Sequence, residues 1–378
     1  MDFELSKEQK DIQKAAREFA EGIFLEFAED CDLQEVFPKE LWKKACALGF
    51  IGVCIDEVYG GAGLGILEHA LITEQFCRVD AGCGSILLTT LGSDFISLYG
   101  REEQKKKYLP GLTKGRAISG LAITEPDVGS DVTSVTTSAQ RVDDAYRVDG
   151  NKMFITNGSI ADFLVVFCLT NESEKARTKR HSALIVETNR KGFEANKLKR
   201  KMGVRASDTA EIRFSGVEVP SENLIGQREG EGFTQLMGVF NRYRVGVAAQ
   251  GVGIAQGGLE KALGYSKQRI QFGKPIGSFQ GIQFKLAEMA TLIEAARGLC
   301  YRAAWMVDRG TVDPKIVAMA KWFSGEVVVK TMDEVLQIHG GYGYLGEYGI
   351  ERAYRDAKLL EIVEGTKEIE KLIIARQL

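Results

Sequence analysis

Apolar residues recur at three-to-four-residue spacing in the first third of the chain, a pattern typical of helices that bury one face. The spacing runs through residues 8–29, 39–49 and 65–79, and the glycine-rich run DEVYGGAGLG separates the last two segments. Pro110 follows the charged run EEQKKKYL and is expected to end this part, because proline interrupts a helix. Residues 1–115 are therefore predicted to form an N-terminal helical domain.

The hydrophobic period changes in the middle of the chain. Short runs rich in Val, Ile and Phe occupy residues 163–170, 182–188 and 210–220, each bounded by Gly, Asn, Asp or Pro. Such runs predict antiparallel strands of a small barrel or sandwich. The charged stretch 172–181 is interpreted as a solvated hairpin loop, with a phosphate-binding patch as the alternative. Residues 116–225 form the predicted middle β domain.

Long helical patterns return in the last third. Residues 244–269 are rich in Gly and Ala, which predicts a helix packed closely against its neighbours, and amphipathic segments follow at 282–309 and 314–338. A final short helix is predicted around 366–377. Residues 226–378 are therefore the predicted C-terminal helical domain, and the fold class of the whole chain is α+β.

Composition narrows the function classes. The 378 residues are 44% hydrophobic and 27% charged with a net charge of -3, as in a soluble globular protein with no reason to bind nucleic acid. No apolar run is long enough to span a membrane, and the N-terminus lacks signal or transit character. The seven cysteines include no CxxC pair, which predicts free thiols in the cytoplasm, and three histidines argue against a metal site.

The segment Ala122-Ile-Thr-Glu-Pro-Asp-Val-Gly-Ser-Asp131 is the first motif with chemical potential. Its turn residues offer backbone N–H groups, and Thr124 and Ser130 add hydroxyls. Such a loop suits an electron-rich ring or a phosphate. A well-capped loop between domains is an equally good interpretation of these residues alone.

Three further motifs are ambiguous when taken singly. Residues 153–158, MFITNG, predict an ordinary hairpin turn. Arg269 begins the run RIQFGKPI and could bind a pyrophosphate or simply lie solvated at a helix end. The glycine-rich run 337–344, QIHGGYGY, follows no predicted strand, so a glycine hinge is favoured over a Rossmann dinucleotide loop.

Glu364 lies in the last motif, Val363-Glu-Gly-Thr-Lys-Glu368. The motif comes just before the final predicted helix, so the carboxylate is expected near the positive end of the helix dipole. A capping carboxylate and a catalytic base are both consistent with this position.

Taken together, the five motifs resemble the acyl-CoA dehydrogenase family along the whole chain, closest to its short-chain, butyryl-CoA-type bacterial branch. The strings TEPDVGSD, FITNG, RIQFGKPI, QIHGGYGY and EGT stand in the family's order and spacing. The resemblance implies a helical domain, a middle antiparallel β domain and a C-terminal four-helix bundle, usually assembled as a homotetramer. It also implies FAD as cofactor, an acyl-CoA thioester as substrate and an electron-transferring flavoprotein as electron acceptor.

The same resemblance assigns residues to the cofactor. Arg269, Phe272 and Gln280 would reach the FAD of a neighbouring subunit, together with Gln337 and Gly341. The implied FAD-binding set is Leu121, Ile123, Thr124, Gly129, Ser130, Phe154, Thr156, Arg269, Phe272, Gln280, Gln337, Gly340, Gly341, Thr366 and Glu368.

The resemblance gives Glu364 the role of base. It would remove the thioester α-proton while a β-hydride passes to flavin N5, and burial would raise its pKa towards the working pH. Some relatives carry the base immediately before an arginine that here is Arg244, but that position holds Tyr243, which cannot serve. Arg244 is expected close to Glu364. The implied substrate-binding set is Ser130, Asn241, Tyr243, Arg244, Val363 and Gly365.

Several residues depart from the family pattern and bear on the acyl group. Val363 stands where many relatives have a tyrosine, Tyr243 is bulkier than the usual residue, and Phe154 replaces a common tryptophan. Compared with the family pattern, one wall of the acyl pocket has therefore lost bulk at Val363, and another has gained it at Tyr243. A compact branched or alicyclic acyl group, such as a cyclohexane or cyclohexene carboxyl thioester, is the resulting hypothesis.

Asp94 is an unusual residue in the segment 84–95, which corresponds to the helix lining the acyl pocket. It either faces outward or caps a turn, or it faces the acyl group as a second acid or base. The segment has no arginine, so a dicarboxylic acyl chain is expected to find no counter-ion. An acyl-CoA oxidase and a non-catalytic CoA-thioester-binding protein remain alternative functions.

Overall fold

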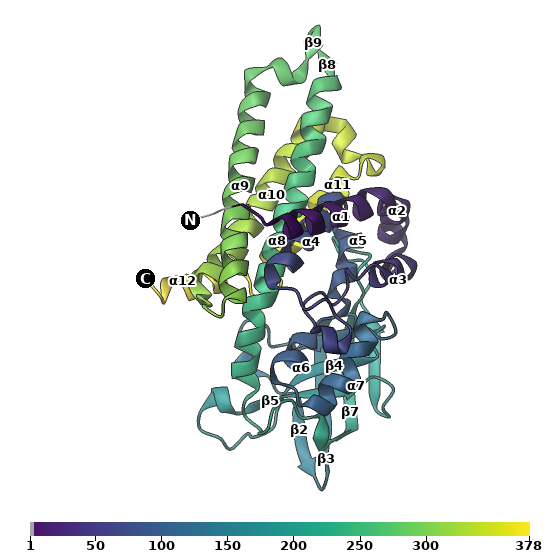
Figure 1. The fold of residues 1–378 in the computed structure, drawn as a ribbon, viewed down its shortest axis with the longest axis vertical. Helices are drawn as coiled ribbons and strands as arrows, with labels where there is room; N and C mark the ends of the chain where they lie inside the picture. Colours follow the sequence, from purple (N-terminus) through teal and green to yellow (C-terminus); the bar gives the residue numbers. More distant parts are fainter. Residues whose placement is uncertain (1–3) are drawn as a thin grey trace.

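The chain folds into a helical N-terminal part, a β-sheet part and a long helical C-terminal part, seen in a computed structural model that describes residues 4–378. The β part lies at one end of the molecule, and the long helix α8 runs from it to the opposite end (Figure 1). The N-terminal helices are α1 (Lys7–Ile23), α2 (Leu25–Gln34), α3 (Lys39–Ala47), α4 (Ile66–Val79), α5 (Ala81–Gly84), α6 (Ser93–Tyr99) and α7 (Glu102–Thr113).

Helix α7 corrects one expectation, because Pro110 lies inside it rather than after it. The proline ring leaves only the carbonyl four residues earlier, that of Lys106, without its helical donor. Lys106 is exposed, so water can satisfy that carbonyl. The helix therefore continues for one more short turn to Thr113.

The middle part is a seven-stranded sheet. Its strands are β1 (Ser119–Ala122), β2 (Ser138–Val142), β3 (Ala145–Thr156), β4 (Phe163–Leu169), β5 (His181–Glu187), β6 (Phe193–Lys197) and β7 (Thr209–Pro220). The pairs β2–β3, β3–β7, β4–β5 and β6–β7 are antiparallel as expected. In contrast, β1 pairs with β4 in parallel, and β2 meets β4 in parallel at Ser138 and Leu169.

Three long helices dominate the C-terminal part: α8 (Gly232–Gln268), α9 (Gln280–Asp308) and α10 (Pro314–His339). The shorter α11 (Ile350–Ala357) and α12 (Lys367–Ala375) both pack against α10 and complete this domain. A two-stranded hairpin, β8 (Ile270–Gln271) and β9 (Lys274–Pro275), joins α8 to α9 at the far end of the molecule from the sheet (Figure 1).

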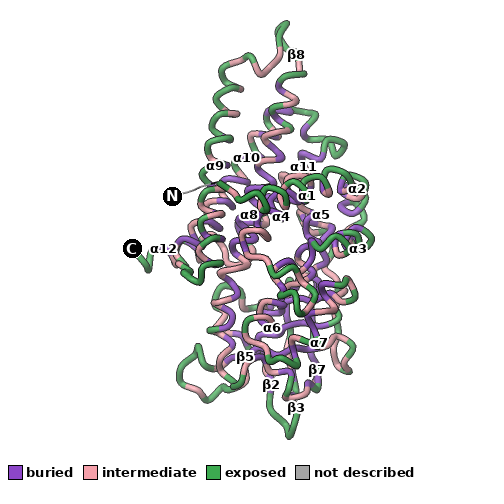
Figure 2. Tube along the Cα trace, in the orientation of Figure 1, coloured by how far each residue is buried: buried purple, intermediate pink, exposed green. Residues whose placement is uncertain are grey.

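Burial follows the predicted periodicities. The strands β4 and β5 are buried almost throughout. The helices α4, α8 and α10 are buried where they pack against one another, whereas the β8–β9 hairpin is exposed (Figure 2). The Gly- and Ala-rich face of α8 makes close contact with α4, since a side chain at Gly253 or Gly257 would collide with the α4 backbone. Close packing thus explains the composition of this helix.

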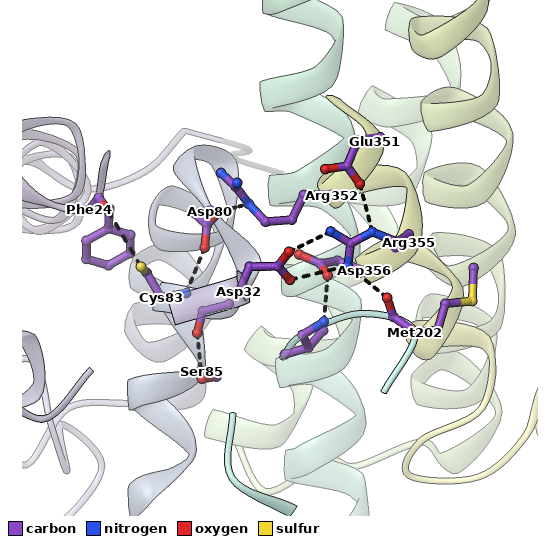
Figure 3. A network of polar contacts seen from close by, with 12 residues as sticks. Phe24, Asp32, Asp80, Cys83, Ser85, Met202, Glu351, Arg352, Arg355 and Asp356 are labelled. Atoms are coloured by element: carbon purple, nitrogen blue, oxygen red, sulfur yellow. Dashed lines mark hydrogen bonds and ion pairs between the residues drawn. The ribbon is translucent and has the colours of Figure 1, made fainter. Parts of the chain in front are cut away.

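A network of charged residues joins the three parts (Figure 3). Arg355 of α11 pairs with Asp32 of α2 at 2.7 Å, and Arg352 pairs with Asp80 at 3.0 Å. The carboxylate of Asp356 accepts the backbone N–H of Val204, in the loop after β6, at 2.5 Å. These contacts fix the loop against helices from both ends of the chain.

All seven cysteines are free thiols, five of them buried and two half-buried, as the sequence predicts. Among residues 4–378, no helix is both long and apolar enough to cross a membrane.

Candidate active site

A cavity of about 470 Å³ lies where the three parts of the chain meet. Residues of α4 and α6 line one side, Phe154 and Thr156 of β3 line another, and α8 and the loop before α12 close it. Glu364, Val363, Tyr243 and Asp94 all line this cavity. Residues predicted from distant motifs are therefore brought together at one place.

The backbone around Glu364 has an unusual conformation. Glu364 has φ 56° and Gly365 has φ 104°, both in the region that disfavours residues with a side chain. Two cations secure it: Arg244 Nε donates to the Glu364 carbonyl at 3.1 Å, and Lys321 Nζ donates to the Gly365 carbonyl at 2.5 Å. Thr366 then caps α12, with its hydroxyl accepting the N–H of Ile369.

The surroundings of Glu364 set its charge. Burial raises the pKa of its carboxyl to about 7, while the positive charges of Arg244 and Lys321 act in the opposite direction. A carboxyl with this pKa is balanced between its two protonation states near neutral pH. That is the property expected of a general base rather than of a simple helix cap.

Glu370 is a second carboxylate at this place, and the sequence motifs did not reveal its part in the site. Its side chain is fully buried, with Oε1 3.0 Å from Arg244 Nε. Burial raises the pKa of Glu370 and lowers that of Lys321, which lies beside it. The carboxylates of Glu364 and Glu370 thus share two nearby cations, Arg244 and Lys321. The sequence does contain one sign of this buried charge cluster. Lys321 is an isolated cation within the apolar run of α10.

Gly365 is required by this arrangement for a second reason. A side chain there would place its first carbon 2.5 Å from Glu370 Oε1 and 3.3 Å from a terminal nitrogen of Arg244. Only glycine lets the base segment pack directly on the buried charges.

The side of the cavity lined by α6 answers the open question about Asp94. Asp94 lines the cavity, and its Oδ1 accepts a hydrogen bond from Arg242 Nε of α8 at 2.6 Å. The cavity therefore does contain an arginine, although Asp94 is already paired with it. The segment 84–95 contains no arginine, but Arg242 reaches the same cavity from another helix. Next to it, the Tyr243 hydroxyl accepts the N–H of Gly92 at 2.8 Å.

The loop after β1 is held rigidly beside the cavity. Buried Glu125 accepts the backbone N–H groups of Thr136 and Thr137, at 2.8 Å and 2.7 Å, and pairs with fully buried Lys152 at 3.1 Å. These bonds leave Gly129 and Ser130 exposed at the surface of the loop. A fixed loop with free backbone groups fits a phosphate or a polar ring edge.

Phe154 forms an uncovered wall next to this loop. It is 64% exposed although it is aromatic and lines the cavity, and its φ is 61°. Leu121 and Ile123 of the neighbouring β1 segment are buried beneath the surface. An exposed aromatic face on a rigid sheet is suited to a planar ring system.

Other predicted residues lie outside the cavity in this chain. Asn241 and Arg244 do not line it, although Tyr243 does. The remaining predicted cofactor residues are exposed or half-buried around the β8–β9 hairpin, the end of α10 and the start of α12. They are Arg269, Phe272, Gln280, Gln337, Gly340, Gly341, Thr366 and Glu368.

Comparison with known proteins decides the family. The N-terminal, middle and C-terminal domains of acyl-CoA dehydrogenases match residues 6–116, 120–217 and 230–378. This chain belongs to the acyl-CoA dehydrogenase family. Its members are flavin oxidoreductases that act on CH–CH bonds, and FAD is their cofactor.

Individual relatives cover nearly the whole chain. An acyl-CoA dehydrogenase of Bacillus subtilis is 43% identical, covering 99% of this chain and 98% of its own length. The solved butyryl-CoA dehydrogenase of Megasphaera elsdenii has a TM-score of 0.95 and 38% identity, covering 100% and 99% of the two chains. A solved chain described with the electron transferring flavoprotein of Acidaminococcus fermentans has a TM-score of 0.96 and 41% identity, with the same coverage.

The residues present fit FAD. The exposed Phe154 wall, Thr156 and the rigid loop carrying Gly129 and Ser130 would hold the flavin and its phosphates beside the cavity. Phe272 is 93% exposed at the tip of the β8–β9 hairpin, far from the sheet of its own chain (Figure 1).

Proposed function

We propose that this acyl-CoA dehydrogenase oxidises the thioester of a short, branched or alicyclic acid, with Glu364 as the base that removes the α-proton. The observation that carries the proposal is the Glu364 carboxyl, which lines the cavity and has a pKa raised to about 7 by burial. When bound, FAD accepts the hydride that leaves the β-carbon of the acyl group.

The backbone of the base also has a chemical role in the proposal. The N–H of Glu364 donates to no acceptor among residues 4–378, and it lies on a loop that lines the cavity. It can therefore donate to the thioester carbonyl and stabilise the negative charge that grows there as the α-proton leaves. Arg244 and Lys321, which bind the carbonyls of Glu364 and Gly365, keep that N–H fixed.

The shape of the cavity supports a compact acyl group. Tyr243 projects into it from α8 and is held by its hydrogen bond to Gly92. Val363, which is smaller than the tyrosine common at this position in the family, lines the same cavity. A long straight chain would have to pass the tyrosine, whereas a ring or branch would fill the space beside the valine. The similar enzyme of Megasphaera elsdenii is named for the four-carbon butyryl group.

Assembly is the second part of the proposal. Phe272, Phe284 and Trp305 are exposed by 93%, 63% and 49% along the β8–β9 hairpin and α9. Exposed apolar side chains of this size are suited to burial against another subunit. We propose a homotetramer in which Arg269, Phe272 and Gln280 reach the FAD of a neighbouring subunit. A monomer of full activity in sedimentation and activity measurements would contradict this assembly.

The electron acceptor and location complete the proposal. An electron-transferring flavoprotein is proposed as acceptor, supported by the likeness to the solved chain described with such a protein. The free thiols fit a reducing compartment, so the cytoplasm is the proposed location.

An anaerobic screen of flavin reduction tests the activity and the acyl group together. The thioesters would be butyryl, isobutyryl, cyclohexanecarboxyl, cyclohexene-carboxyl, glutaryl and palmitoyl-CoA. Rapid bleaching of the flavin absorbance by the small branched or cyclic compounds is the expected result. Much faster bleaching by palmitoyl-CoA or glutaryl-CoA would contradict the proposed acyl class.

The same screen separates the alternatives. When air is admitted after bleaching, the flavin of a dehydrogenase stays reduced, whereas the flavin of an oxidase recovers its colour at once. A protein that only binds CoA thioesters would show no bleaching with any of them.

A further inference from the structure

The acyl side of the cavity contains an ion pair where a hydrocarbon pocket needs none. Asp94 and Arg242 both line the cavity, and their side chains are 18% and 20% exposed. Each therefore retains some contact with the cavity while most of its surface is covered by protein. Pairing offsets the cost of bringing both charges out of water.

The pair uses only part of its hydrogen-bonding capacity. The bond joins Arg242 Nε to Asp94 Oδ1, and neither terminal nitrogen of Arg242 bonds to another residue within 4–378. Asp94 Oδ2 likewise has no donor in the part of the chain that the structure describes. Each of these atoms retains some accessible surface, and both residues line the cavity.

Two neighbours add further polar atoms to the same wall. The Tyr243 hydroxyl accepts the N–H of Gly92, and its own proton has no acceptor within residues 4–378. The ring of His69, on α4, lines the cavity and is close enough to Asp94 and Arg242 for both charges to affect its pKa, which burial lowers. A neutral imidazole offers one donor and one acceptor.

We infer that this wall selects an acyl group carrying a neutral hydrogen-bonding substituent, a hydroxyl or carbonyl, on the part that reaches Asp94 and Arg242. The inference rests on the proposed function and deepens it, because it concerns the same thioester and the same cavity. A hydroxyl can donate to Asp94 Oδ2 and accept from a terminal nitrogen of Arg242, whereas a methyl group would leave these atoms without a partner.

The charge balance of the wall favours a neutral substituent over a carboxylate. Asp94 neutralises Arg242, so the pair has no net charge. An acyl carboxylate bound to Arg242 would lie next to the Asp94 carboxylate and be repelled. A hydroxyl meets no such repulsion.

Matched thioesters test the inference in the FAD-loaded enzyme. Cyclohexanecarboxyl-CoA is compared with its 4-hydroxy derivative, and valeryl-CoA with 5-hydroxyvaleryl-CoA, by kcat/KM and by anaerobic flavin bleaching. The expected preference for the hydroxylated member of at least one pair is roughly 10- to 100-fold, the range of one hydrogen bond to a charged group. Equal or better turnover of the hydrocarbon member in both pairs would overturn the inference.

Two variants make the test specific. Replacing both charges together, as Asp94→Leu with Arg242→Met, removes the pair without leaving one charge alone. It is expected to reverse the preference towards the hydrocarbon thioester. Asp94→Asn leaves Arg242 as an uncompensated cation and is expected to raise the turnover of glutaryl-CoA relative to the hydroxylated thioester about 10-fold or more.

A matched control removes an ion pair elsewhere. Lys14 and Glu18 form an exposed pair on α1, and Lys14→Met with Glu18→Leu should leave every ratio unchanged. An unchanged hydroxyl preference in the Asp94 and Arg242 double variant would overturn the assignment of this wall. Absence of flavin bleaching with every thioester would instead contradict the proposed function itself.

Discussion

The guanidinium of Arg244 binds Glu364 through the main chain: Arg244 Nε donates to the Glu364 carbonyl at 3.1 Å and lies 3.0 Å from the buried Glu370 carboxylate. The arginine therefore holds the position of the proposed base without forming an ion pair with its carboxylate. A direct pair would lower the pKa of Glu364 and weaken it as a base. Glu370 takes that partnership instead.

Substitution of Glu364 tests its role as base. Glu364→Gln keeps the size of the side chain but cannot accept a proton, so the rate of anaerobic flavin reduction should fall by about 10²- to 10⁴-fold. Stopped-flow measurement of the flavin absorbance gives the rate. Glu294→Gln is the matched control, since Glu294 is exposed on α9 and 73% of its side chain contacts solvent. A Glu364 variant as fast as this control would exclude Glu364 as the base.

The pH dependence of the same rate tests the electrostatics. Because the pKa of Glu364 is raised to about 7, the rate should increase with pH through a midpoint near neutrality. The positive charge of Lys321 lowers that pKa, so Lys321→Gln should move the midpoint to higher pH. A midpoint that stays the same or moves to lower pH would show that Lys321 does not act on the base.

The buried cluster predicts a non-additive effect on stability. Arg244→Met leaves Glu370 buried without its nearest cation and should lower the free energy of unfolding by about 3–5 kcal/mol. Adding Glu370→Met removes the orphaned charge and should restore part of that loss. Urea unfolding of the two single variants and the double variant measures the coupling. Strict additivity of the two changes would show that the residues do not stabilise each other.

Asp356 gives the interdomain network a pH dependence. Burial and the nearby Asp80 raise its pKa from 3.8 to about 7, so the folded protein binds a proton there more tightly than the unfolded chain does. The resulting stability is present in full below pH 3.8 and is lost as pH rises through about 7. Asp356→Asn should therefore flatten the decline in melting temperature between pH 3.8 and about 7.

Asn can still accept the N–H of Val204, so the loop contact survives this change. Asp30→Asn on the exposed side of α2 is the control for removing one carboxylate. If both variants show the wild-type decline, Asp356 is not the group that titrates.

The local pattern was sufficient to predict the long helices and the strands β4, β5 and β7. Helical spacing predicted a segment at 39–49, and α3 occupies Lys39–Ala47; the Val- and Phe-rich run 163–170 is β4, Phe163–Leu169. These signals are local because each element buries one face or one whole strand. The parallel pairing of β1 with β4 was not predictable, since no residue of either strand specifies the direction of its neighbour.

By itself, the sequence determined the family resemblance, the motif that contains Glu364 and the exclusion of Tyr243 as base, because these depend on residue type and order. Only the tertiary structure decided the chemistry around them. Arg242 lies 148 residues from Asp94, and Lys321 lies 44 residues from Gly365, so no local pattern could pair them. Charges act through space in a poorly solvated interior, and their effect on a carboxylate depends on which ones the fold places beside it.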